Sequence, residues 1–306
     1  MRSITLFAPA TVANVSCGFD LLGFALESVG DQMLIRENNV NQLRITKIEG
    51  QMLPMQTEQN VAGVAGLALL NQLNTKQGFD IEIYKKIKPG SGIGSSAASA
   101  AGAVFGLNEL LGKPFSSIEL VAFAMKGEAL AGGAEHGDNV APCLLGGFTL
   151  IQSYNPLRVV SLPTPEALSV VILHPQIEVK TADARNLLKQ QVSLKKAVRQ
   201  SGYLGGFVAG LFQNDYDLLA ASLRDEWVES SRSVLIPAFD EMKAAALASG
   251  ALGFGISGSG PSVFALCKGV EIAKKTAQAI RHVFDKTAIP YDLHHSEVNP
   301  QGIKTL

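Results

Sequence analysis

A glycine-rich loop in the first third of the chain constrains its fold more than any other stretch. Residues 89–99 read P-G-S-G-I-G-S-S-A-A-S and stand between an alternating apolar run that ends at Ile87 and a long segment of small helix-forming residues. This order predicts a strand, a loop and a helix. Gly90, Gly92 and Gly94 permit positive φ angles, and the first N–H groups of the helix have no partner within it. The stretch therefore predicts an anion site, with phosphate as the expected ligand.

The loop alone leaves the source of the phosphate open. A Walker A loop would place Lys after its last glycine, where this chain has Ser95. A dinucleotide fingerprint would read G-x-G-x-x-G and lead to a second strand ending in an acid, whereas this loop reads G-x-G-x-G and the sequence after it is helix-like to about Ala131. A structural turn without a ligand also fits. Ser95 and Ser96 could cap the helix or turn a hydroxyl toward a phosphate or its metal ion.

The composition excludes several classes of partner. The 306 residues carry a formal net charge of −1 and no run of Lys and Arg that would attract nucleic acid or an anionic membrane. No apolar run reaches the roughly 18 residues of a membrane span. Cys17, Cys143 and Cys267 lack metal-site spacing and are expected as buried thiols of a reducing compartment, and Pro9 interrupts the N-terminus too soon for a secretory signal. We therefore predict a cytoplasmic protein without nucleic-acid or membrane partners.

Local patterns predict a mixed order of strands and helices. Residues 3–8 are expected as a strand that Pro9 stops, and helices are expected at residues 60–73, 95–111 and 116–131. Asn60 is the expected cap of the first of these helices, and Ser116 or Ser117 with Glu119 that of the third. The second half is α+β, and its helical residues 192–223 are expected to break at 202–206 and at 214–215. The P-T-P at 163–165 marks the expected boundary between two domains, residues 1–163 and 164–306.

A second informative segment, residues 128–147, gathers polar side chains among alanines and glycines. Glu128 could hold Mg²⁺ beside a nucleotide, because that ion takes few protein oxygens and keeps several waters. Asp138 could accept a proton from a hydroxyl nucleophile, and His136 could donate to a substrate group. Asn139 completes the cluster. A polar surface loop is the alternative reading.

Other polar residues admit two interpretations each. Asn14 and Asp20 flank a turn of small residues, which favours local turn chemistry but also permits contact with a substrate. Arg185 and Arg232 are single cations that could be solvated or could form a fork for a substrate carboxylate. A second glycine cluster, residues 253–266, predicts a strand, a tight loop and a strand. That loop could close over a ligand through its N–H groups or could be a plain hairpin.

Taken together, the motifs resemble those of the GHMP small-molecule kinases, and among them the homoserine kinases. Residues 9–20 resemble the first motif of that family, residues 90–96 its ATP loop, and residues 258–262 its third motif. The stretch H-G-D-N-V-A-P at 136–142 is similar to one found in the homoserine branch. The likeness covers the whole chain in order.

The resemblance implies an α+β, two-domain GHMP kinase fold, with an N-terminal domain like domain 2 of ribosomal protein S5 and a ferredoxin-like C-terminal domain. It implies ATP as phosphate donor, Mg²⁺ held by Ser96 and Glu128, and a homodimer. The nucleotide contacts that it implies are Pro89, Gly90, Ser91, Gly92, Ile93, Gly94, Ser95, Ser96, Ala97, Ala98, Ser99, Gly258, Ser259 and Gly260. The homoserine contacts that it implies are Asn14, Asp20, His136, Asn139, Arg185 and Arg232.

The implied reaction is ATP-dependent phosphorylation of the side-chain hydroxyl of L-homoserine, in threonine biosynthesis. Mevalonate-type members carry an early Lys and an Asp that deprotonates the hydroxyl; here no Lys lies between Leu6 and Leu26, and Asp138 stands where a base could act. A base is not obligatory, because a loose phosphoryl-transfer transition state depends mainly on positioning and charge neutralisation. A sister kinase for mevalonate or a sugar, and a non-catalytic nucleotide- or metabolite-binding regulator, are the alternatives.

Overall fold

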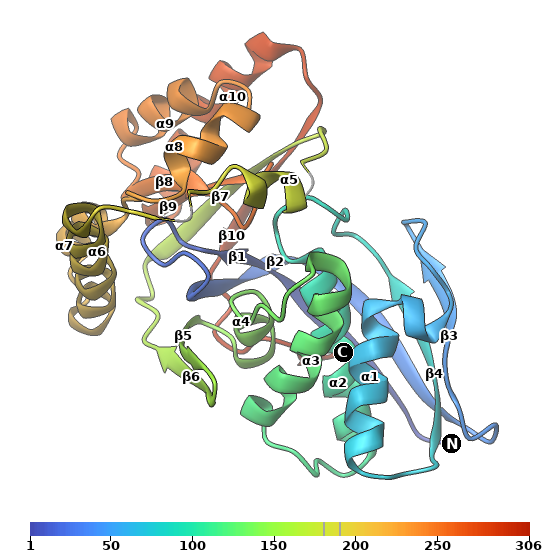
Figure 1. The fold of residues 1–306 in the computed structure, drawn as a ribbon. Helices are drawn as coiled ribbons and strands as arrows, with labels where there is room; N and C mark the ends of the chain where they lie inside the picture. Colours follow the sequence, from blue (N-terminus) through green and yellow to red (C-terminus); the bar gives the residue numbers. More distant parts are fainter. Residues whose placement is uncertain (180, 190) are drawn as a thin grey trace.

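The chain folds into two lobes, each a sheet covered by helices (Figure 1). This computed structural model describes residues 1–179, 181–189 and 191–306, with the backbone alone for 181–183. The first lobe contains β1 (Ser3–Ala13), β2 (Leu22–Asn38), β3 (Leu43–Glu49), α1 (Val61–Gln72), β4 (Gly78–Tyr84), α2 (Ser95–Leu110), α3 (Ser117–Gly132), α4 (Val140–Leu145), β5 (Phe148–Tyr154) and β6 (Leu157–Leu162). The remaining elements are β7 (Leu168–Pro175), α5 (Thr181–Asn186), α6 (Leu194–Gln213), α7 (Tyr216–Ser222), α8 (Glu229–Arg232), α9 (Phe239–Ala248), β8 (Gly253–Ile256), β9 (Val263–Lys268), α10 (Val270–Phe284), β10 (Tyr291–Glu297) and β11 (Lys304–Thr305).

The sheet of the first lobe has the strand order β11-β1-β2-β4-β3, with β5 pairing to β2 and β6 to β5. Helices α1, α2 and α4 pack on it, and α3 packs on α1 and α2. The predicted caps are confirmed: the Asn60 side chain accepts the Ala62 N–H, and Ser116 with Glu119 forms a capping box. Small residues along α2 allow it to approach the sheet closely, since a Cβ on Gly102 would lie 2.3 Å from the Met33 sulfur.

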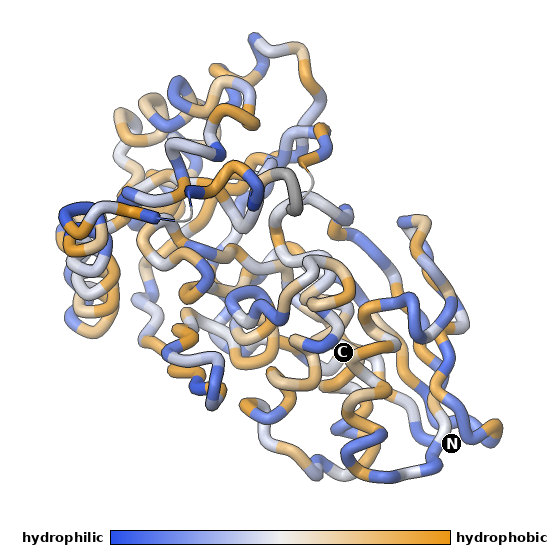
Figure 2. The backbone as a smooth tube through the Cα atoms, in the orientation of Figure 1, coloured by the Kyte–Doolittle hydropathy of each residue, from blue (hydrophilic) through white to orange (hydrophobic). Residues whose placement is uncertain are grey.

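The sheet of the second lobe is antiparallel, with the order β10-β7-β9-β8. The chain visits it as strand, helices, two strands, helix and strand, which is the ferredoxin-like arrangement. The spacing of buried residues along helix α10 explains why this helix packs on the sheet. Its buried residues, Ala273, Thr276, Ile280 and Phe284, recur every three or four positions, and the helix alternates between hydrophobic and hydrophilic in Figure 2.

Two local expectations were wrong, and one of the two roles considered for Ser95, that of a helix cap, is absent. Strand β1 continues through Pro9 to Ala13, because its pairing with β2 shifts register between Pro9 and Thr11, and such an irregularity tolerates a missing N–H. Helix α6 runs unbroken through residues 202–206; a Cβ on Gly206 would lie 2.5 Å from the Ser222 hydroxyl, so this glycine allows close packing on α7. Ser95 does not cap α2: Gly94 is the N-cap, and the Ser95 hydroxyl donates instead to the Ile87 carbonyl at 2.9 Å.

The lobes are joined by more than the linker after β6. The Ser296 hydroxyl of β10 accepts the N–H groups of Glu27 and Ser28, and β11 returns to pair with β1. The division at residues 163 and 164 stays a prediction, and it lies in the connection between β6 and β7.

Candidate active site

A cavity of about 640 Å³ lies between the two lobes. Its walls come from three sources: the connection before α1, the glycine loop with the ends of α2 and α3, and a set of polar side chains from both lobes. The lining residues are Asn14, Asp20, Leu53, Pro54, Gln59, Asn60, Val61, Lys85, Pro89, Gly90, Gly92, Gly94, Ser95, Ser96, Ser99, Glu128, Ala131, Gly132, Gly133, Ala134, His136, Asp138, Asn139, Arg185, Arg232, Gly258 and Ser259. All six predicted homoserine contacts, and most of the predicted nucleotide contacts, therefore line one cavity.

The glycine loop adopts the backbone conformation that its sequence predicts. Gly90, Gly92 and Gly94 have φ angles of 73°, 83° and 72°, in the left-handed region that favours glycine. A Cβ on Gly94 would lie 2.1 Å from the Thr11 hydroxyl, so a larger residue would displace β1. The loop delivers the chain into the N-terminus of α2, whose unpaired N–H groups favour an anion.

Five predicted nucleotide contacts are not among the residues that line the cavity. Ser91 and Ile93 are buried within the loop, Ala97 and Ala98 are buried in α2, and Gly260 is buried in the β8–β9 loop. The N–H groups of Ser91 and Ala98 also donate within the chain, to the Lys88 and Gly94 carbonyls.

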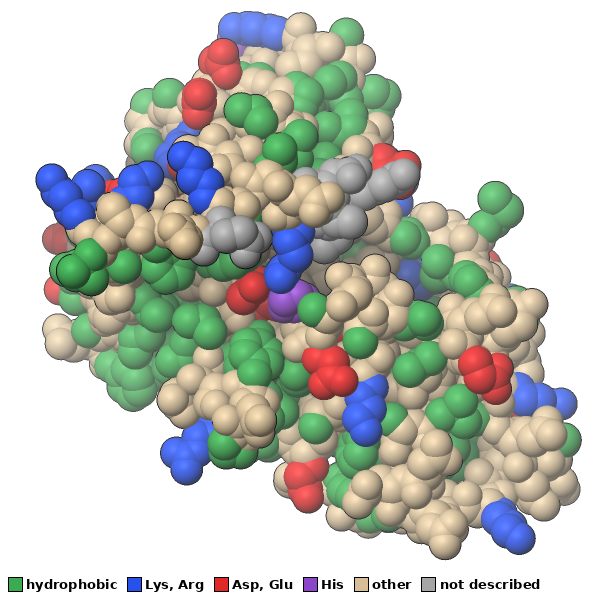
Figure 3. Space-filling view, in the orientation of Figure 1, with side chains coloured by type: hydrophobic (Ala, Val, Ile, Leu, Met, Phe, Trp, Pro, Cys, Tyr) green, Lys and Arg blue, Asp and Glu red, His purple; other side chains and the backbone are tan. Residues whose placement is uncertain are grey.

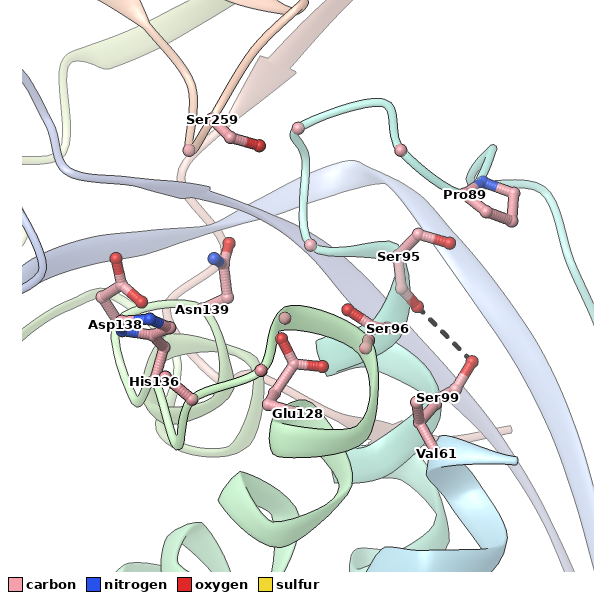
Figure 4. Close-up of a pocket in the computed structure, with 18 of the residues that line it drawn as sticks. Val61, Pro89, Ser95, Ser96, Ser99, Glu128, His136, Asp138, Asn139 and Ser259 are labelled. Atoms are coloured by element: carbon pink, nitrogen blue, oxygen red, sulfur yellow. Dashed lines mark hydrogen bonds between the residues drawn. The ribbon is translucent and has the colours of Figure 1, made fainter. Parts of the chain in front are cut away.

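Ser96 and Glu128 lie beside one another in the cavity wall, from the first turn of α2 and the C-terminal half of α3 (Figure 4). Burial raises the pKa of Glu128 to about 7, while the Ser96 hydrogen bond and the Lys85 charge act in the opposite direction. The Oε1 atom of Glu128 is buried and has no hydrogen-bond partner within the part of the chain that the structure describes. A hard oxygen donor left unpaired beside a hydroxyl is chemistry that fits Mg²⁺.

A buried ion pair beneath the loop was not identified from the sequence. Lys85 and Asp31 form a salt bridge in which both side chains are at most 1 % exposed. The Lys85 ammonium also donates to the Ser95 carbonyl at 2.8 Å and to the Ser99 hydroxyl at 3.1 Å. Asp31 accepts the N–H groups of residues 86 and 87 at 2.7 and 2.9 Å. Through these hydrogen bonds, the ion pair fixes both the backbone that leads into the glycine loop and the first turn of α2.

The sequence contained a signal for this pair. Phe79, Ile81, Ile83 and Ile87 alternate as inward-facing residues of one strand run, and Lys85 occupies the inward position between them. A charge on the buried face of a strand requires a partner, because an unpaired charge in the interior is costly.

On the opposite side of the cavity, charged side chains from separate segments converge. The Nη2 atom of Arg185 donates to both Asp20 carboxylate oxygens at 3.1 and 3.2 Å and to His136 Nε2 at 3.0 Å. In a neutral His136, Nε2 is therefore the acceptor and Nδ1 carries the hydrogen, 3.8 Å from Asp20. Burial lowers the pKa of His136 and so favours this neutral form. Figure 3 shows acidic, basic and histidine side chains together in the hollow between the lobes.

Arg232 differs from Arg185 in being almost completely buried. Its Nε donates to the Ala184 carbonyl and its Nη1 to the Gly258 carbonyl, both at 3.2 Å, and its guanidinium lies 5.3 Å from the centre of the Phe19 ring. The Gly258 carbonyl also accepts from the Asn14 side chain at 2.7 Å. Burial lowers the pKa of Arg232, but a guanidinium remains charged in any accessible pH range.

Asp138 and Asn139 line the cavity at the start of α4 (Figure 4). Burial, with the nearby charges of Asp20 and Glu128, raises the pKa of Asp138 to about 7. Asn139 accepts a hydrogen bond from Thr11 at 2.8 Å. Near pH 7, therefore, the Asp138 carboxyl group is present in comparable amounts as its protonated and its ionised form.

The wall formed by Leu53, Pro54 and Val61 was also missed by the sequence analysis. It lies in the irregular connection between β3 and α1, where the pattern of residues carries no local signal for a ligand. With Gln59 and Asn60 beside it, this wall combines apolar surface with amide groups, a composition typical of small-molecule sites.

The class of protein follows from comparison of this fold and cavity with known families. Residues 60–147 match the family model of the GHMP kinases N terminal domain, and residues 207–286 match that of the GHMP kinases C terminal domain. The fold alone is shared with a galactokinase from Lactococcus lactis solved with galactose, at a TM-score of 0.72 and 16% identity over 100% of this chain and 95% of that one.

Closer relatives narrow the class. Homoserine kinases of Chlorobium phaeobacteroides (strain BS1) and Chloroherpeton thalassium are 42% and 43% identical over 100% of this chain and of theirs. A crystal structure of homoserine kinase from Cytophaga hutchinsonii superposes with a TM-score of 0.96 at 51% identity, over 100% of this chain and 98% of that one. The chain therefore belongs to the homoserine kinase family of the GHMP kinases.

Proposed function

We propose that this chain transfers the γ-phosphoryl group of ATP to the side-chain hydroxyl of L-homoserine, yielding O-phospho-L-homoserine and ADP in threonine biosynthesis. The observation that carries the proposal is a single cavity with an anion-binding loop on one side and a charged cluster suited to a zwitterion on the other. The bond between the γ-phosphorus and the ADP oxygen breaks as the homoserine oxygen bonds to phosphorus.

The glycine loop and the N-terminus of α2 bind the phosphates of ATP in this proposal. Backbone N–H groups of residues 92–96 supply the donors, and Lys85 holds the first turn of α2 from below. Ser96 and Glu128 are the residues that would hold Mg²⁺, and the ion would neutralise phosphate charge. The adenosine lies against the wall of Leu53, Pro54 and Val61.

The charged cluster binds the amino acid. Arg232 and Arg185 attract the carboxylate, since a guanidinium fork matches the geometry of a carboxylate. Asp20 attracts the ammonium group, and Asn14, His136 and Asn139 contribute further polar contacts. Arg232 suits an orienting role because its burial and its hydrogen bonds to two backbone carbonyls fix the direction in which its guanidinium points.

Asp138 is our candidate for the acceptor of the hydroxyl proton. Its carboxyl group is buried in the cavity wall, and its raised pKa of about 7 makes it a stronger base than an ordinary Asp near neutral pH. Once the new oxygen–phosphorus bond forms, the hydroxyl proton becomes acidic, so a base of modest strength is sufficient.

The experiment that tests the proposal is ADP release with Mg·ATP, comparing L-homoserine with mevalonate, galactose and L-serine. Turnover on L-homoserine alone is expected. Turnover on another alcohol would retain the phosphate side of the site but remove the assignments of Asn139 and Arg232. ATP binding without turnover on any of the four would instead favour a regulatory protein.

Two further predictions accompany this function. A homodimer is expected and can be measured by sedimentation, and a cytoplasmic location is expected and can be measured by fractionation. Among the helices of the described residues, none combines the length and apolar composition needed to span a membrane.

A further inference from the structure

The glycine loop of the first lobe makes direct contact with the β8–β9 loop of the second lobe. The Ser257 hydroxyl donates to the Gly92 carbonyl at 2.8 Å, and the Ser262 N–H donates to the Ser91 carbonyl at 3.2 Å. The fit leaves no room for a side chain, since a Cβ on Gly92 would lie 2.6 Å from the Gly260 carbonyl oxygen. Two consecutive carbonyl groups of the phosphate loop are therefore held by one loop of the other lobe.

Holding a carbonyl group also orients the next N–H group. A trans peptide unit is planar, and its C=O and N–H bonds point in opposite directions. The bond to the Ser91 carbonyl therefore sets the direction of the Gly92 N–H, and the bond to the Gly92 carbonyl sets that of the Ile93 N–H. Both N–H groups point away from the β8–β9 loop. Successive oriented N–H groups of this kind form the concave anion sites of phosphate loops.

We propose that Ser257 is a positioning residue for the nucleotide phosphates, acting through the Gly92 carbonyl. Its side chain is fully buried, so no water replaces the bond that it makes. The β8–β9 loop is also held by hydrogen bonds within itself. The Ser257 N–H donates to the Ser262 carbonyl at 2.9 Å, and the Ser257 carbonyl accepts the Gly260 N–H at 2.9 Å. Ser257 therefore presents its hydroxyl to the phosphate loop from a rigid support.

The chain contains a matched control for this inference. Ser262 lies in the same loop and is equally buried, but its hydroxyl has no hydrogen-bond partner among the described residues. Ser262→Ala removes the same atom from the same loop without removing a bond to Gly92. Loss of an unsatisfied buried hydroxyl is neutral or stabilising.

The test compares Ser257→Ala, Ser262→Ala and Ser257→Thr with the unmodified chain. Dissociation constants for Mg·ATP and Mg·ADP are measured by calorimetry, the homoserine KM by ADP release, and Tm by thermal unfolding. Ser257→Ala is expected to weaken binding of both nucleotides by about 2- to 10-fold, the effect of one lost hydrogen bond, with little change in homoserine KM. Ser262→Ala is expected to bind as the unmodified chain does, and Ser257→Thr to recover affinity because it retains the hydroxyl.

Three results would overturn the proposal: unchanged nucleotide affinity in Ser257→Ala, equal weakening in Ser262→Ala, or a loss of Tm with nucleotide affinity and homoserine KM affected alike. The inference rests on the proposed use of ATP, but calorimetry needs no turnover. An unmodified chain that binds ATP without phosphorylating homoserine would refute the proposed substrate and leave this test valid.

Discussion

The side of the cavity that we propose for the phosphates (the phosphate side) comes from one continuous stretch and uses mainly backbone groups. The side that we propose for the acceptor alcohol (the acceptor side) is assembled from separate segments and uses charged side chains. Residues 89–99 supply most of the first side. The Arg185–Asp20 contact of the second side joins residues 165 positions apart. The first side is anchored by the buried Lys85–Asp31 pair, and the second by an ion pair whose side chains are 42% and 30% exposed.

This difference indicates a division of roles. In the proposed function the donor is always ATP, so a rigid backbone cradle with an internal anchor is sufficient to bind its phosphates. The acceptor determines which alcohol reacts, and charged side chains on separate segments can be exchanged without disturbing the cradle. The following predictions test that division.

The largest expected effect is on stability, from Lys85→Met. Removing one partner of a buried ion pair leaves the other charge uncompensated, and we expect the free energy of unfolding to fall by about 3–5 kcal/mol. Arg185→Met is the matched control, because its half-exposed pair contributes at most about 1 kcal/mol. Urea denaturation measures both. Similar losses for the two variants would show that the two sides are anchored alike.

The next effect is on turnover, from Glu128→Gln. An amide cannot replace the carboxylate charge toward Mg²⁺, and we expect kcat to fall by about 10²–10³-fold, as for other electrostatic groups of this kind. Nucleotide affinity, measured by calorimetry, should fall much less. Equal losses of affinity and turnover would mean that the metal site is assigned wrongly.

A smaller effect is expected on homoserine binding, from Arg232→Ala. Loss of a charge-assisted contact should raise the homoserine KM by about 10- to 100-fold while the ATP KM hardly changes. Arg199→Ala serves as control, because Arg199 pairs with Glu226 on the surface, away from the cavity lining. An unchanged homoserine KM would remove Arg232 from the acceptor side.

The smallest effect concerns pH. The raised pKa of Asp138 means that the group is protonated below about pH 7 and ionised above it. If the ionised form accepts the proton, kcat/KM for homoserine at saturating Mg·ATP is lost as pH falls through about 7, by about tenfold for each further unit. Asp138→Asn should remove this dependence together with much of the activity. If the pH profile of Asp138→Asn has the same shape as that of the unmodified chain, the pH dependence arises from another group.

Much of the fold and of the phosphate side was predictable because its determinants are local. Positive φ at Gly90, Gly92 and Gly94, and the caps at Asn60 and Ser116, depend on residues within a few positions of one another. The family was predicted from short motifs of this local kind, and the comparisons confirm it. The breaks predicted in β1 and α6 were wrong because pairing with β2 and packing on α7 outweigh the local preferences of Pro and Gly.

The sequence by itself therefore determined the strand–loop–helix of the cradle, the α+β class and the family, since each depends on neighbouring residues or on short motifs. Only the tertiary structure decided that Arg185, Asp20 and His136 meet, that Lys85 is buried against Asp31, and that Ser257 holds Gly92. The physical reason is that burial and charge pairing depend on contacts between distant segments. Burial in the assembled cavity, which no local pattern records, likewise raises the pKa values of Glu128 and Asp138.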